Sequence, residues 1–150
     1  MKSIITVLLL ALLLGCSQSY SKEDFSFEVD FYCANQKDFL QLADLINDHD
    51  WKKKGERRQL KLISPYWKRN EDIYLTVKEL FQDLKIYKIQ VALDSTTSKV
   101  HSIKIFMDKK FDGHYSYKIY PHQPISIDNY FSNKYVEFKI GENATFIFEQ

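Results

Sequence analysis

Glycine, proline and cysteine are scarce in this chain of 150 residues. It has four glycines, three prolines and two cysteines, but ten tyrosines, eleven phenylalanines and two tryptophans. So few glycines and prolines argue against a disordered chain and against a loop-rich scaffold. The length suits one domain that buries an aromatic-rich core.

An excess of charge of one sign is also missing. The chain has 21 basic and 20 acidic side chains, which gives a formal net charge of +1. No general attraction to nucleic acid or to anionic lipid follows from such a balance. We therefore expect no nucleic-acid partner.

Catalytic and metal-binding motifs are the third absence. The chain has no Gly-x-Ser-x-Gly elbow, no phosphate-binding glycine loop, and no His-x-x-x-His or Cys-x-x-Cys spacing. We predict no enzyme activity, no cofactor and no metal, although two carboxylates that meet in space remain an alternative. The densest polar and aromatic cluster is interpreted as surface tyrosines and turn histidines; it comprises Asp112, His114, Tyr115, Tyr117, Tyr120 and His122.

What the chain does contain, at its start, is an export signal. Lys2 precedes an apolar run of eleven residues, Ile4 to Leu14, which is shorter than the roughly 20 residues that span a bilayer. A short apolar run behind a positive start is typical of a cleaved signal peptide. The run ends in Leu13-Leu14-Gly15-Cys16, which resembles the lipobox of bacterial lipoproteins.

This resemblance implies a processing route. Residues 1–15 would be removed, and Cys16 would carry acyl chains that anchor the protein in a lipid bilayer, since stable anchoring needs two or more chains. Ser17, rather than aspartate, follows the cysteine and favours the outer membrane over the inner membrane. The alternative is an ordinary signal peptide with an incidental cysteine.

Acylation of Cys16 leaves Cys33 as the remaining cysteine. A single cysteine forms no internal disulfide, so the exported domain must be stable without one. Cys33 alternates with Val29 and Phe31, which predicts a thiol on the apolar face of a strand, buried and unreactive. A nucleophilic thiol is the alternative.

Hydrophobic spacing predicts the elements of one domain over residues 25–150, after a tether over residues 16–24. Apolar residues alternate over residues 25–33, which predicts a strand. Helical spacing predicts two amphipathic helices, one from Asn35 to about Asp48 and one from Asn70 to about Lys85. Alternation returns in the last third of the chain, where strands are expected over residues 87–93, 101–107, 115–119, 136–140 and 145–148, with a short strand possible at 59–64.

We therefore predict an α+β domain with an antiparallel sheet of about five to six strands, mostly a meander, and two helices packed on one face. The spacing also predicts a set of core residues: Phe39, Leu42, Ile46, Val77, Leu80, Phe81, Ile103, Ile105 and Phe138.

The segment from Trp51 to Arg69 holds eight basic residues and one acid, Glu56. One interpretation is a solvated loop that balances the acidic segment before it. The other is a weak partner-binding site, because Trp, Tyr and Arg dominate interface energetics; it comprises Trp51, Lys52, Lys53, Lys54, Arg57, Arg58, Tyr66 and Trp67. The sequence thus predicts a small envelope lipoprotein with a binding or structural role, or alternatively an immunity-type lipoprotein that blocks a periplasmic toxin.

Overall fold

The structure is a computed structural model that describes residues 20–48, 57–60, 71–97, 99–107, 113–122 and 124–150. A short 3-10 helix, η1 (Glu23–Phe25), precedes three α-helices and seven strands. Their order along the chain is α2 (Ser26–Ala34), α3 (Gln36–Asn47), β1 (Arg57–Leu60), α4 (Glu71–Asp83), β2 (Ile86–Leu93), β3 (Val100–Met107), β4 (His114–Ile119), β5 (Tyr130–Phe131), β6 (Tyr135–Lys139) and β7 (Ala144–Glu149).

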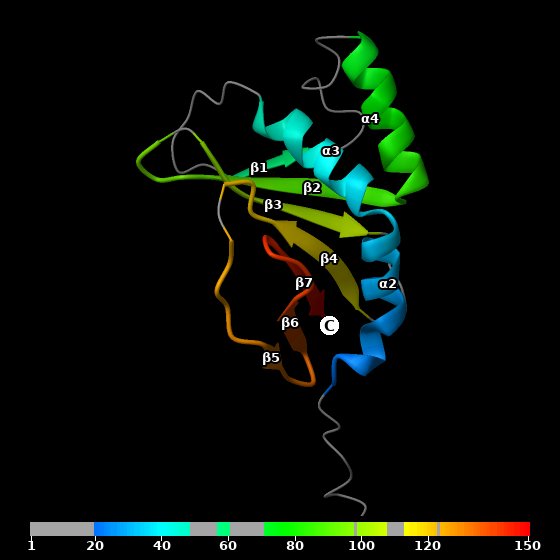
Figure 1. The fold of residues 1–150 in the computed structure, drawn as a ribbon, viewed down its shortest axis with the longest axis vertical. Helices are drawn as coiled ribbons and strands as arrows, with labels where there is room; N and C mark the ends of the chain where they lie inside the picture. The colour runs from blue at the N-terminus through cyan, green and yellow to red at the C-terminus, as the bar shows by residue number, and fades with distance from the viewer. Residues whose placement is uncertain (1–19, 49–56, 61–70, 98, 108–112, 123) are drawn as a thin grey trace, which may run out of the picture.

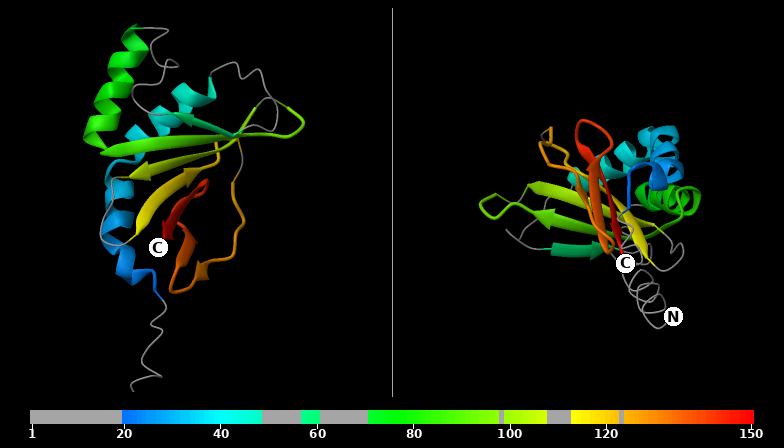
Figure 2. Two further views of the ribbon diagram at one scale, coloured as in Figure 1. Left: turned by 180° about the vertical axis from the view of Figure 1, so that it is seen from behind. Right: turned by 90° about the horizontal axis from the view of Figure 1, so that it is seen from below.

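The strands form one antiparallel sheet, and the helices gather on one of its faces (Figures 1 and 2). The α+β class and the two amphipathic helices are confirmed, while the strand count is seven rather than five or six. All nine predicted core residues are buried. Ile73, whose spacing places it on the buried face of α4, is instead exposed.

The strand order, β1-β2-β3-β4-β7-β6-β5, corrects the predicted meander. Strand β7 lies between β4 and β6 and pairs with β4 over six residues. Pro121 and Pro124 lack the backbone N–H that a hairpin strand beside β4 would need to donate. The edge of β4 is therefore filled by the last strand, where Phe146 lies opposite Tyr117 in the core.

The segment predicted as a strand over residues 25–33 is a helix, η1 followed by α2, and that prediction is wrong. Phe25 and Tyr32 are seven positions apart and both are buried, which is helical spacing. Tyr32 packs against Phe39 and Tyr117, with ring centroids 5.2 and 5.3 Å away. Aromatic residues stand at both odd and even positions of residues 25–33, so their spacing fits a strand and a helix alike. The helix forms because it can cover an apolar part of the sheet that would otherwise be exposed.

Because this segment is a helix, the prediction for Cys33 is also wrong: its side chain is exposed on α2 rather than buried on a strand. Asn35 begins α3 as expected, but its side chain does not cap that helix. Its amide Nδ2 instead donates to the carbonyl of Phe31, 2.8 Å away, and so satisfies the end of α2. One residue thus ends the first helix and begins the second.

Candidate binding surface on the uncovered sheet face

Every strand contributes alternate residues to the face of the sheet that the helices leave uncovered. Cross-strand register places Gln90, Lys104, Lys118, Thr145 and Lys139 directly opposite one another in a row across β2, β3, β4, β7 and β6. Their sequence neighbours point to the helices and are mostly aliphatic or aromatic. Period-two alternation therefore produces one apolar face and one polar, lysine-rich face.

The polar face is hollowed where β2, β3, β4, β6 and β7 meet. A hollow of about 190 Å³ is lined by Gln90, Ala92, Ser102, Lys104, Lys118, Tyr135 and Ile147. Ser102 and Ile147 are buried although no helix covers them. Strand direction turns strongly from β2 to β6 (Figure 1), and this coiling bends the polar face into a concave surface that shields its floor.

The two lysines of the hollow differ in their partners. The Lys104 ammonium lies 2.9 Å from the Glu149 carboxylate, and its side chain is 16% exposed. The Lys118 ammonium lies over the ring of Tyr120, 4.9 Å from the centroid. Among the residues that the structure describes, Lys118 has no carboxylate within the 4.0 Å of an ion pair. Of the two lysines that line the hollow, Lys104 is thus ion-paired, whereas Lys118 contacts an aromatic ring and no carboxylate of the described part of the chain.

Tyr135 closes one side of the hollow as a neutral donor. Its hydroxyl donates to Glu137 Oε2 at 2.5 Å, and Thr145 Oγ1 donates to Glu137 Oε1 at 3.4 Å. Burial, and then the bond to Glu137, raise the pKa of Tyr135 above its usual range. The phenol therefore stays protonated at neutral pH and donates to Glu137, a carboxylate that adjoins the hollow. The polar residues that line the hollow are thus two lysines, one amide and two hydroxyl groups.

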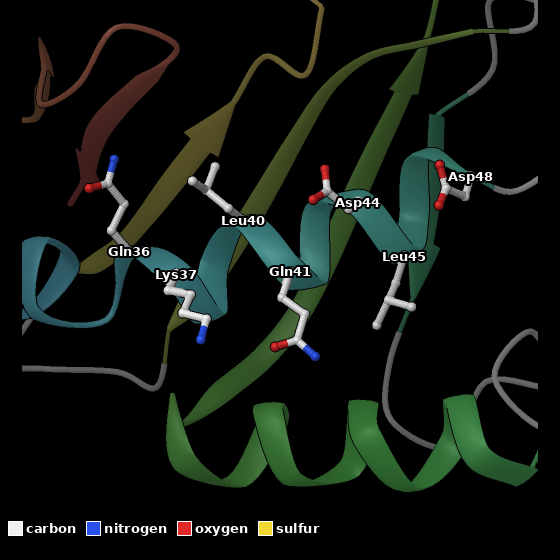
Figure 3. Close-up of a pocket in the computed structure, with 7 residues that line it drawn as sticks. All are labelled: Gln36, Lys37, Leu40, Gln41, Asp44, Leu45 and Asp48. Atoms are coloured by element: carbon white, nitrogen blue, oxygen red, sulfur yellow. The ribbon is translucent and has the colours of Figure 1, made fainter.

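Two further hollows lie on the helix side. One, of about 350 Å³, lies between the start of α2 and the sheet and is lined by Tyr20, Asp24, Phe25, Ser26, Phe27, Glu28, Tyr115 and Phe148. The other is an open groove of about 630 Å³ along α3, where Lys37, Gln41 and Leu45 point toward α4 (Figure 3). The groove along α3 is lined by charges of both signs, Lys37, Asp44 and Asp48, whereas both charged residues that line the sheet hollow are lysines. The polar sheet face is therefore the stronger candidate site for an anion.

The binding segment predicted from the sequence lies mostly outside the described residues; these are Trp51, Lys52, Lys53, Lys54, Tyr66 and Trp67, and the proposed lipidation site Cys16 lies outside them as well. Arg57 and Arg58 belong to β1, the edge strand beside β2, and the Arg58 side chain is exposed. The described part of that segment therefore borders the polar sheet face without lining its hollow.

Sequence reasoning missed Gln90, Lys104, Lys118 and Tyr135. The available signal was the lysines at alternate positions of three predicted strands, which a solvated face explains equally well. Only the curvature of the sheet brings these side chains to one hollow.

The histidines stay apart. His114 begins β4 and His122 follows its end, and both are exposed, whereas Asp112 lies outside the described residues. The prediction that the tyrosines of this cluster lie at the surface is wrong, because Tyr117 and Tyr120 are buried in the domain. No group of three or more His, Cys, Asp or Glu residues in the described ranges could hold a metal ion. In the same ranges, no helix has the length and apolarity needed to cross a membrane.

Comparison of the chain with protein-family models, with curated proteins and with solved structures finds no match.

Proposed function

We propose that this protein is a lipid-anchored envelope protein with a binding role, and that its polar sheet face binds an anionic group of a partner. The lipobox-like Leu13-Leu14-Gly15-Cys16 supports the anchor. The observation that carries the binding role is Lys118, which lines the hollow opposite Lys104 and whose ammonium has no carboxylate partner among the described residues.

An anion bound there gains charge-assisted hydrogen bonds in a partly dehydrated setting, where such bonds are about twice as strong as neutral ones. Lys104 lies opposite Lys118 in the register, so the two side chains arise at adjacent positions, and an anion held by both would draw the Lys118 ammonium from its place over Tyr120 toward Lys104. The amide of Gln90 and the hydroxyl of Ser102 supply neutral polar contacts that orient it.

The size of the hollow indicates what kind of ligand fits. Sites for whole small molecules usually measure about 300–1,000 Å³. The hollow measures about 190 Å³, which suits a single carboxylate or phosphate group. We therefore propose recognition of an acidic group that projects from a larger envelope partner. An immunity-type role is the special case in which that partner is a toxin.

The anchor is tested by replacing Cys16 with Ser and fractionating the cells. We expect the wild-type protein in the membrane fraction with acyl chains on its first residue, and the Cys16→Ser protein released or unprocessed. Equal membrane localisation and equal processed mass of both proteins would refute the anchor.

The binding role is tested on residues 17–150 by following backbone amide resonances during titration with sodium acetate at constant ionic strength. We expect acetate to shift the amides of Lys104, Lys118 and Thr145 in the wild type. Lys118→Met should abolish these shifts, whereas the matched variant Lys78→Met, on the exposed side of α4, should retain them. Equal titration of Lys118→Met and wild type would refute the site.

A further inference from the structure

Large hydrophobic side chains are exposed at several places in the described chain, namely Phe27, Ile73, Leu75, Tyr87 and Tyr130. Phe27, at the start of α2, is 66% exposed and Tyr130, in β5, is 57% exposed. The start of α2 and strand β5 lie at the same end of the long axis in both Figure 1 and the rear view of Figure 2. Helix α4, with the exposed Leu75, lies toward the opposite end.

The end with Phe27 and Tyr130 is also where the described chain begins. Tyr20 packs against Phe25 and Phe148, with ring centroids 5.5 and 5.1 Å away, so the first described residue is held on this end of the domain. Phe27 and Tyr20 also line the aromatic hollow of about 350 Å³ beside α2. The chain thus enters the domain among aromatic rings.

The length of chain before Tyr20 sets the distance to an anchor. Cys16 is four residues before Tyr20, and fully extended chain spans at most about 3.6 Å per residue, or about 14 Å in all. If Cys16 is acylated, as the proposed function holds, Tyr20 therefore stays within about 14 Å of the acylated residue and holds this end of the domain toward the headgroups.

We propose that this end, defined by Tyr20, Phe27 and Tyr130, docks on the lipid surface to which the anchor ties it. Aromatic residues, tyrosine in particular, suit the boundary between headgroups and acyl chains because one end of the ring is apolar and the other polar. Lys22 lies next to Glu23 and Asp24 at the start of the described chain, so this end has both signs of charge. Docking therefore depends on the aromatic rings and does not require anionic lipid.

Docking gives the molecule one orientation. Helix α4 then points away from the bilayer, and the polar sheet face stands alongside the membrane normal, open to a partner from the side (Figure 1). In the cell, this docking depends on the proposed acylation of Cys16. It can be tested separately, because an anchor of any chemistry at residue 16 holds the domain at the same distance from the lipid surface.

The experiment therefore supplies the anchor chemically. Every core residue lies at or after Phe25, so residues 16–150 contain the whole described fold. With Cys33→Ser, which replaces an exposed thiol, Cys16 is coupled to a maleimide lipid in vesicles of phosphatidylcholine. Tryptophan is placed by Phe27→Trp, by Tyr130→Trp, or by the control Leu75→Trp, and fluorescence is measured with and without bromine in the acyl chains.

We expect bromine to quench the emission of Phe27→Trp and Tyr130→Trp at least twofold more than that of Leu75→Trp, after subtraction of the signal from the native tryptophans. Addition of 0.5 M salt should leave this difference unchanged. Equal quenching at positions 27 and 75 would overturn the proposal whatever becomes of Cys16 in the cell. A concentration-dependent change in the emission of the Phe27→Trp variant without lipid would also overturn it, because it would indicate a second copy as the occupant.

Discussion

The two faces of the sheet are built from the same strands and yet serve different ends. On the covered face, Tyr117 and Phe146 lie opposite each other and are fully buried under the helices. On the other face, the neighbouring residues Lys118 and Thr145 lie opposite each other; Lys118 lines the polar hollow, whereas Thr145 is fully buried. One step along a strand thus separates a residue that stabilises the fold from one available to a ligand. Substitutions on the two faces should separate stability from binding.

The largest effect is expected at the centre of the covered face. Phe39 is fully buried, and its ring centroid lies 4.9 Å from that of Tyr117 and 5.2 Å from that of Tyr32. Phe39→Ala should lower the free energy of unfolding by about 3–5 kcal/mol, from lost apolar burial and the cavity left behind. Urea denaturation measures this, with Phe27→Ala as the exposed control, expected within about 0.5 kcal/mol of wild type. Similar losses in both variants would contradict the assignment of α2.

A smaller loss is expected where a side chain joins α2 to the sheet. The Tyr117 hydroxyl donates to the carbonyl oxygen of Glu28, 2.7 Å away, in the buried interior. Tyr117→Phe removes that bond and should cost about 1–2 kcal/mol. The same denaturation experiment measures the loss, and a variant as stable as the wild type would show that this bond contributes nothing.

Removal of the Tyr32 hydroxyl, on the same covered face, should have the opposite effect on stability. Its hydroxyl is buried and has no hydrogen-bond partner in the described part of the chain. Tyr32→Phe should therefore raise the free energy of unfolding at pH 7 by about 1 kcal/mol, since a buried unpaired group carries its full desolvation cost. Loss of stability in this variant would show that the hydroxyl is paired in solution.

The pH dependence sharpens the same comparison. Burial raises the pKa of Tyr32 to about 12 from an ordinary value of 10.0. Between these two values the unfolded chain loses this proton and the folded chain keeps it, so stability falls as pH rises through that window. The wild type should lose more stability between pH 10 and 12 than Tyr32→Phe, as thermal unfolding in that range will measure. Parallel losses would exclude Tyr32 as the source.

The smallest effects are expected on the uncovered face. Lys104→Met breaks the ion pair with Glu149 at a partly exposed position and should cost about 0.5 kcal/mol. Lys118→Met removes a cation without an ion-pair partner in the described residues, so its stability should match or slightly exceed that of wild type. A loss of several kcal/mol in Lys118→Met would assign the residue to the fold rather than to a ligand.

Residues 25–33 show why part of the fold escaped prediction. Phe25, Phe27, Val29, Phe31 and Cys33 alternate as in a strand, but the intervening Tyr32 is the residue that fills the core at 1% exposure. With apolar residues on both sides of the alternation, local spacing fits a strand and a helix alike. The helix forms because the side chains of Tyr117 and Phe146 on the sheet must be buried, and a helix can cover them.

The candidate site was not predicted from the sequence for a related reason. Lysines at alternate strand positions are visible in the sequence, but their distance from one another across strands depends on register and strand order. The insertion of β7 between β4 and β6 brings Tyr135 and Ile147 beside Lys118. No pattern along the chain specifies that insertion.

The sequence by itself determined the elements whose periodicity admits one interpretation. These are α3, α4, the strands β2, β3, β4, β6 and β7 and the nine core residues, because a single apolar stripe or face can be buried in one way. Tertiary structure decided that residues 26–34 are helical, that the last strand enters the middle of the sheet, and that two lysines share a hollow. In each case the deciding free energy comes from burial and charge between segments far apart in the chain, which local spacing does not record.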